Sequence, residues 1–180
     1  MSRALLAPVM PGLIISFFAI VVGTSLGMAF GLYEEPIRGY LTTQIKAHPE
    51  VHDQAPDSVN RDVNKAWRDI QRAHFHAQGL GALGVGIILV LSLSWVSAPV
   101  KQWVALATGL GALLYPFCWL LMGLRVGPMG AEAAHASVDW LAGVSVPLFF
   151  GGMLLTLLIL VLGWLFPDEM PGVLKKFSSE

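Results

Sequence analysis

Charged side chains are scarce in this chain of 180 residues, at 13% of the total, whereas an ordinary soluble domain carries about 25%. The 11 basic and 12 acidic residues leave a net charge of −1, so the basic excess that a nucleic-acid-binding surface requires is missing. Cysteine is almost absent too. With Cys118 alone, the chain can form neither a disulfide framework nor a cysteine-based zinc or iron–sulfur site.

Apolar residues are abundant: 55% of the chain is hydrophobic and the mean hydropathy is +0.65. A soluble protein of this size could not bury that much apolar surface. Four long segments carry no charge, between Arg3 and Glu34, Arg72 and Lys101, Lys101 and Arg125, and Asp139 and Asp168. Each exceeds the roughly 20 residues that a helix needs to cross the hydrocarbon core, and in lipid such segments must be helical.

The sequence therefore predicts an all-α integral membrane protein, a single membrane domain over 1–180. We expect a four-transmembrane-helix up-down bundle with spans near 9–33, 74–97, 102–124 and 137–166, because short loops make sequential helices antiparallel. Its partners would be the lipid bilayer and either other membrane subunits or a second copy of the chain, with no nucleic acid. The expected location is a bacterial inner membrane.

A polar insert, residues 34–73, holds 13 of the 23 charges. Its middle, around His48 and His52, predicts a solvated loop. Asp57 or Ser58 can then cap a helix that runs without a breaker into the second span. An apolar stripe follows helical spacing on this stretch: Val59, Val63, Trp67, Ile70 and His74. We expect that stripe to be covered by the loop after Tyr33 or by a partner protein.

The membrane orientation stays open. On the side of the insert lie seven Lys and Arg residues, against four on the other side, so the positive-inside rule favours an internal insert. Arg3 and the pair Lys175 and Lys176 favour internal termini instead. In either case, we expect both termini to lie opposite the insert and the 125–135 loop.

Three histidines lie near the ends of spans on one side of the membrane. His74 and His76 begin the second span, and His135 precedes the fourth. Ionisable groups at this depth are functional candidates, and histidines from two bundle helices can bind a haem or a metal between them. Small residues beside His74 allow a partner helix or a flat macrocycle to come close to that ring. Arg72 beside His76 could instead pair with the propionate of a haem. The alternative is that these rings are only interfacial residues.

Two further side chains complete the candidate site. Asp139 follows His135 by four residues, so the carboxylate can orient the imidazole. Arg125, at the same predicted level, can neutralise an acidic ligand group or Asp139. The predicted cofactor-binding residues are Arg72, His74, His76, Arg125, His135 and Asp139, with the three histidines as the metal ligands.

The stretch from His74 to Gly81, HFHAQGLG, resembles the H-x-H-x-[NQ]-x-L-G signature of relatives of haem–copper oxidase subunit I and other small haem-type membrane proteins. In that family, a histidine at one end of such a helix is an axial ligand of a low-spin haem and pairs with a histidine from a distant helix. The resemblance implicates His74 or His76, with His135 as the partner. The chain has far fewer spans than that family and lacks its copper-binding histidine cluster, so oxygen reduction is not implied.

Three functions compete at this point. The first is a small membrane electron-transfer protein or subunit with a b-type haem, or copper as the second choice, between the second and fourth helices. The second is an accessory subunit without a cofactor, docking through residues 58–73. The third is a small transporter that uses Gln78 and Asp139. No nucleophile–base arrangement indicates an enzyme.

Overall fold

The computed structural model describes residues 3–166, and these residues form helices with short connections and no strand. The elements are α1 (Arg3–Leu6), the 3-10 helix η1 (Ala7–Val9), α2 (Met10–Ala47), α3 (Pro56–Ser92), α4 (Ala98–Met129), α5 (Ala131–Ala136) and α6 (Asp139–Leu165). Four helical stretches, the first running from Ala7 through α2, are long and apolar enough to cross a membrane. The prediction of an all-α integral membrane protein with four spanning helices is confirmed.

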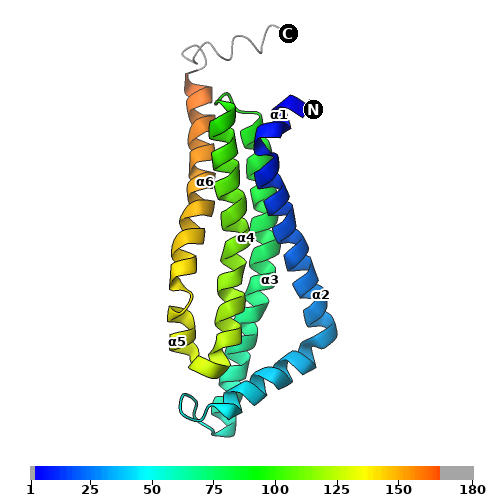
Figure 1. Cartoon of the computed structure of the whole chain (residues 1–180), viewed down its shortest axis with the longest axis vertical. Coiled ribbons are helices and arrows are strands. Elements are labelled where there is room, and N and C mark those ends of the chain that lie inside the picture. Colours follow the sequence, from blue (N-terminus) through cyan, green and yellow to red (C-terminus); the bar gives the residue numbers. More distant parts are fainter. Residues whose placement is uncertain (1–2, 167–180) are drawn as a thin grey trace.

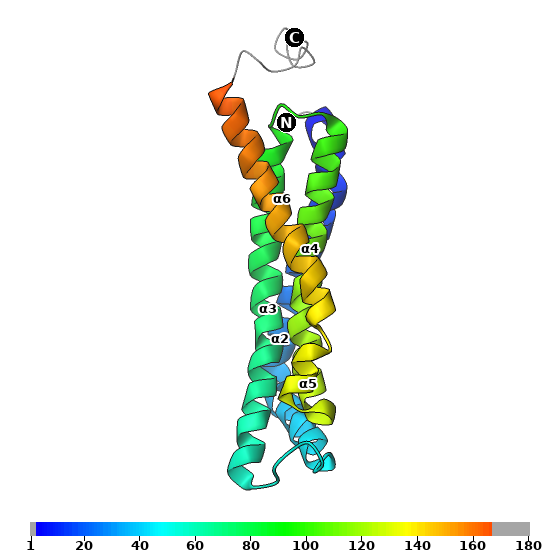
Figure 2. The same ribbon diagram turned by 90° about the vertical axis from the view of Figure 1, so that its left-hand side faces the viewer.

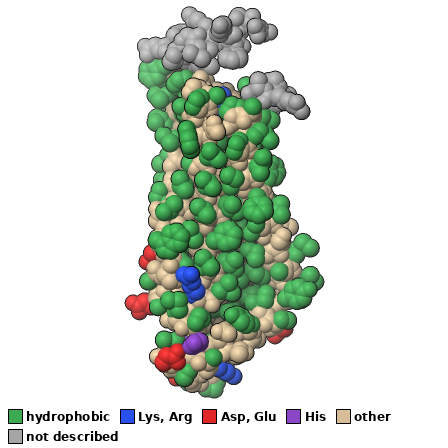
Figure 3. All heavy atoms as spheres, viewed as in Figure 1, with side chains coloured by type: hydrophobic (Ala, Val, Ile, Leu, Met, Phe, Trp, Pro, Cys, Tyr) green, Lys and Arg blue, Asp and Glu red, His purple; other side chains and the backbone are tan. Residues whose placement is uncertain are grey.

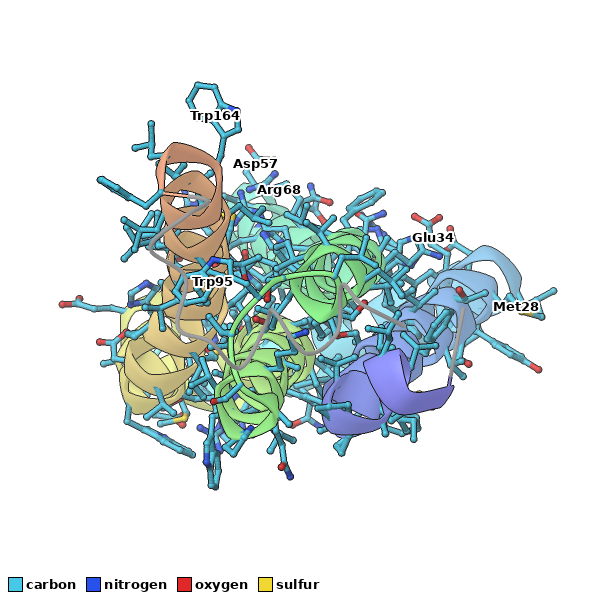
Figure 4. All side chains as sticks on the ribbon, turned by 90° about the horizontal axis from the view of Figure 1, so that it is seen from above. Met28, Glu34, Asp57, Arg68, Trp95 and Trp164 are labelled. Atoms are coloured by element: carbon cyan, nitrogen blue, oxygen red, sulfur yellow. The ribbon has the colours of Figure 1, made fainter. Side chains whose placement is uncertain are left out.

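Helix α4 holds the bundle together (Figure 1). It packs against α2, α3 and α6, whereas α6 contacts α4 chiefly and α3 only slightly. Seen from above, α6 with Trp164 lies on one side of the bundle, and α2 with Met28 and Glu34 lies on another (Figure 4). The beginning of the chain's first helix and the end of α6 lie at one end of the bundle, opposite the 48–55 loop (Figures 1 and 2). Lys175 and Lys176 fall outside the described residues.

A kink in α2 shapes the polar end. Tyr33 departs from helical geometry (φ −128°, ψ 25°), and Pro36 follows inside the helix. Proline has no N–H to donate and its ring crowds the preceding turn, so the helix bends there. The stretch after Tyr33, expected to be a loop, is instead a helix to Ala47 that turns beneath the bundle (Figure 1).

This second part of α2 covers the apolar stripe of α3. One buried cluster contains Leu41, Ile45, Val59, Val63, Ala66, Trp67, Ile70, Val126 and Ala134. Trp67 keeps only 5% of its surface exposed. The prediction that another segment covers Trp67 is confirmed, and the apolar stripe is used within the chain rather than left as a docking surface.

Helix α3 is unbroken from Pro56 to Ser92, as the sequence predicts. Its start differs from the prediction, because neither Asp57 nor Ser58 caps it: Ala55 is the N-cap and makes no side-chain cap bond. Asp53 orders this turn instead. Its carboxylate accepts hydrogen bonds from the Ala55 N–H (3.0 Å) and from the Ser58 hydroxyl (2.8 Å).

Hydrophobic side chains cover most of the visible face of the bundle, and charged side chains gather toward the end that carries the 48–55 loop (Figure 3). This division matches a membrane-embedded part and a polar end.

Candidate functional site

His74 faces α2. Its Nδ1 donates to the backbone carbonyl of Gly23 over 2.7 Å, and its ring lies where a side chain on Gly27 would be, 2.8 Å from Nδ1 to a Cβ built there. Gly81 packs on α2 in the same way, against Ile20 and Ser16. The small-residue face that includes His74 is therefore a packed face, as the sequence predicts, but its neighbour is α2 and not α6.

His76 faces α4. The ring stacks on Trp119 with 5.6 Å between centroids and 21° between planes, and it meets Tyr115 edge-on at 5.1 Å. Its Nδ1 lies 2.8 Å from the carbonyl oxygen of Arg72. Because a carbonyl only accepts, Nδ1 carries the proton, and the lone pair of a neutral ring is then on Nε2.

A cation and a buried donor accompany this ring. The Arg72 guanidinium carbon lies 4.8 Å from the centroid of Trp119, and Arg72 also donates to the buried carboxylate of Asp69 over 2.9 Å. The indole Nε1 of Trp119 is buried and has no hydrogen-bond partner within residues 3–166. His76, Trp119, Tyr115 and Arg72 together form what we call the His76 cluster.

His135 points outward. Its Nδ1 lies 3.2 Å from an oxygen of Asp139, as their spacing predicts, but the two side chains are 65% and 60% exposed. Arg125 does not contact Asp139. It donates to the hydroxyl of Ser137 over 2.9 Å and more weakly to that residue's carbonyl, so it ties α4 to the start of α6.

The histidines also differ in depth. His76 stacks on Trp119 of α4. Ser137 is bonded to Arg125, which lies six residues after Trp119, or about 9 Å further along α4 toward the polar end. His135 lies two residues before Ser137 and next to Ala134, which belongs to the buried cluster at the polar end that also contains Val63. The expectation that His74 or His76 and His135 face one another at one level is therefore corrected.

These positions do not fit a haem held between α3 and α6 by two histidines of this chain. Among the described residues, no group of three or more His, Cys, Asp or Glu side chains is placed to hold a metal. The residues expected to line a transport path also lie apart. Gln78 donates to Thr24 on α2 over 3.2 Å, whereas Asp139 belongs to α6, which packs on α4.

His52 is the polar residue that the sequence reasoning placed wrongly. We expected a solvated side chain, but it is only 2% exposed. Its Nδ1 lies 2.8 Å from Asp62 Oδ2, and its Nε2 lies 2.9 Å from the Gly127 oxygen and 3.0 Å from the Val126 oxygen. Nothing in the local pattern around Pro49 signals this, because the acceptors come from the distant end of α4.

Lys101 is a second buried polar residue without a local sequence signal. Its Nζ donates to the carbonyl of Ser92 over 2.8 Å, near the end of α3. The last carbonyls of a helix have no intrahelical donor, so this ammonium stabilises the hairpin between α3 and α4.

Taken together, the contacts put His74 between α2 and α3, the His76 cluster on the α3–α4 face, and His135 with Asp139 on the outside of the polar end. The His76 cluster is the one among these that combines an imidazole with an available lone pair, flat aromatic rings and a cation. No protein-family model, curated protein or solved structure matches this chain.

Proposed function

We propose that this chain is a subunit of an electron-transfer complex in a bacterial cytoplasmic membrane, and that His76 would hold one b-type haem. One observation carries the proposal: Nδ1 of His76 donates to the Arg72 carbonyl. Histidines that bind a metal through one nitrogen commonly donate from the other to a backbone carbonyl or carboxylate, which fixes the tautomer and the orientation of the ring.

The surroundings of His76 support the same reading. Trp119 and Tyr115 hold the imidazole by stacking and edge contacts. Arg72 supplies a cation for a propionate, and the buried indole N–H of Trp119 is a donor that a bound group could satisfy. A bound haem would supply reversible one-electron transfer at its iron. Since His74 and His135 face elsewhere, any further protein group that held the haem would come from a second copy or from another membrane subunit.

The test is an absorption spectrum of the detergent-purified protein, produced with an ample haem supply, before and after reduction. We expect a Soret band that shifts on reduction in the wild type, in His74→Ala and in His135→Ala, and its loss or a change of spin state in His76→Ala. A colourless wild type contradicts the proposal, and so does an unchanged spectrum in His76→Ala. Copper, the alternative metal, would be detected by elemental analysis of the same samples.

A second candidate function is an accessory subunit that holds no cofactor. The observation that favours it is that His74 and Gln78 tie α3 to α2, while Arg125 ties α4 to α6. These side chains then serve assembly of the bundle. A colourless, metal-free wild type in which His76→Ala leaves the complex with other membrane subunits intact would favour this function over the first.

A further inference from the structure

One side chain of the 48–55 loop, that of His52, connects the loop to both α3 and the end of α4. His52 lies in this loop, Asp62 lies on α3, and the carbonyls of Val126 and Gly127 lie at the end of α4. The imidazole is the one group that bonds to both helices from the loop at this point. Its 2% exposure means that water does not replace these partners.

Both ring nitrogens of His52 face acceptors. A carboxylate and a carbonyl cannot donate, so each bond requires an N–H on the ring, and a neutral imidazole has only one. The protonated ring has both. The end of α4 adds to this preference, because the last carbonyls of a helix carry partial negative charge and the Gly127 carbonyl, unlike that of Val126, is not bonded by the Gly130 N–H. Gly130, with φ +77°, ends α4 here and leaves the Gly127 carbonyl for His52.

The charge of Asp62 acts in the same direction. Burial lowers the pKa of His52, but the bonds to Asp62 and to the two carbonyls outweigh it, so the pKa is raised above the ordinary 6.5. Asp62 also has Arg61 within 3.8 Å. The loop itself also carries Glu50, Asp53 and His48, of which His48 bonds Glu50. Lys46 lies in the last turn of α2 and Glu132 on α5, and the last turn of α4 has no basic residue.

The direction of the pH effect follows from the raised pKa. The extra stability from His52 is fully present below the unfolded value of about 6.5 and is lost as the pH rises through the higher folded value. Deprotonation leaves a lone pair on one nitrogen, which then faces either the Asp62 carboxylate or the carbonyls of α4. One of the two connections must break.

We propose that His52 is a pH-sensitive clasp that holds the 48–55 loop against α3 and the α4–α5 turn when it is protonated and releases the loop when it is not. The release has a structural consequence next to it. A hollow of about 520 Å³ is lined by Val51, Met129, Gly130, Ala131, Glu132, Ala133 and Ala136. Val51 adjoins His52, so movement of the loop removes one wall of that hollow.

Hydrogen exchange of the full-length protein in detergent tests the clasp. After correction for the intrinsic effect of pH on exchange, we expect protection of residues 50–55 to fall about tenfold or more between about pH 6 and about pH 9, since deprotonation removes a buried hydrogen bond to a charged ring. His52→Gln should abolish this dependence, and Asp62→Asn should move its midpoint to lower pH. His48→Gln, a control in the same loop whose ring bonds Glu50 over 2.8 Å, should leave it unchanged.

Protection that does not change with pH in the wild type overturns the proposal, and so does a pH dependence that survives in His52→Gln. If His52→Gln does not fold, nitrogen NMR of the histidine rings in the wild type decides the question. His52 should then remain protonated on both nitrogens above its ordinary pKa of 6.5. A ring that is neutral near that value overturns the clasp.

Discussion

The attachment of α6 to the bundle depends on Gly111, and a single added methyl group there should loosen it. A Cβ built at Gly111 would lie 2.7 Å from the Cα and from the Cβ of Phe149 on α6. Carbon atoms in contact are ordinarily about 3.5–4.0 Å apart. Gly111→Ala therefore requires the two helices to separate locally by about 1 Å, because the opposing atoms include backbone that cannot rotate away.

The expected loss follows from that overlap and from the position of α6. Adding a methylene or methyl group to a well-packed contact typically destabilises by about 1–3 kcal/mol, which is about 5- to 150-fold in the folded-to-unfolded ratio. Since α6 packs chiefly on α4, no other helix compensates. The neighbouring contact of Gly152 with Thr108 should loosen at the same time.

Unfolding in mixed detergent micelles with increasing dodecyl sulfate, followed by tryptophan fluorescence, measures this effect. Gly151→Ala is the matched control, because a Cβ there meets no atom within 4 Å. We expect its free energy of unfolding to stay the same or to rise by up to about 1 kcal/mol, from helix propensity. Equal stability of Gly111→Ala and Gly151→Ala would refute the close packing of α4 on α6.

Two other predictions concern polar contacts, those of His74 and of Asp53. His74→Ala should lower the free energy of unfolding in the same assay by about 0.5–1.5 kcal/mol, because it removes the interhelical donor to the Gly23 carbonyl, which keeps its bond within α2. The exposed His135→Ala should change it by less than about 0.5 kcal/mol. Equal effects would contradict the interhelical role of His74. The hydrogen bonds from Ala55 and Ser58 lower the pKa of Asp53 below the ordinary 3.8. The amides at the start of α3 should therefore be protected from exchange above pH 3.8, and this end of the helix should fray as the pH falls through the lower folded pKa of Asp53. Corrected amide exchange of residues 55–59 measures this, and Asp53→Asn should show no such transition.

The spans could be predicted because the bilayer imposes a simple rule. A helix that crosses lipid cannot carry unpaired charges, so the charge-free intervals locate the spans directly. These intervals lie between Arg3 and Glu34, Arg72 and Lys101, Lys101 and Arg125, and Asp139 and Asp168. The end of α2 was missed for the opposite reason. Pro36 and the charges beyond Tyr33 indicate a break, yet the helix resumes because Leu41 and Ile45 bury themselves against α3. That gain comes from tertiary packing, which local sequence does not contain.

Helical spacing identifies which residues share a face but not which helix covers that face. The prediction that one face of α3 carries His74, Ala77 and Gly81 is confirmed. Two antiparallel helices, α2 and α4, pack against α3. This face packs against α2 because Gly23 leaves room for Gln78 and Gly27 leaves room for the ring of His74. The same limit applies to His52, whose acceptors on α4 are more than 70 residues away.

The positions of the histidines along the bundle axis were predicted wrongly for a separate reason. These positions decide which histidines can act together. The sequence places His76 and His135 on the same side of the membrane, and we took the starts of their two spans as one level. The structure instead aligns Ser137 with Arg125 and His76 with Trp119, an offset of about 9 Å along α4. Topology fixes only the side, because a spanning helix can project beyond the lipid by any number of turns. Since α3 begins at Pro56 and α6 at Asp139, two histidines near the nominal starts of spans need not meet, and His76 must be judged by the contacts that it makes itself.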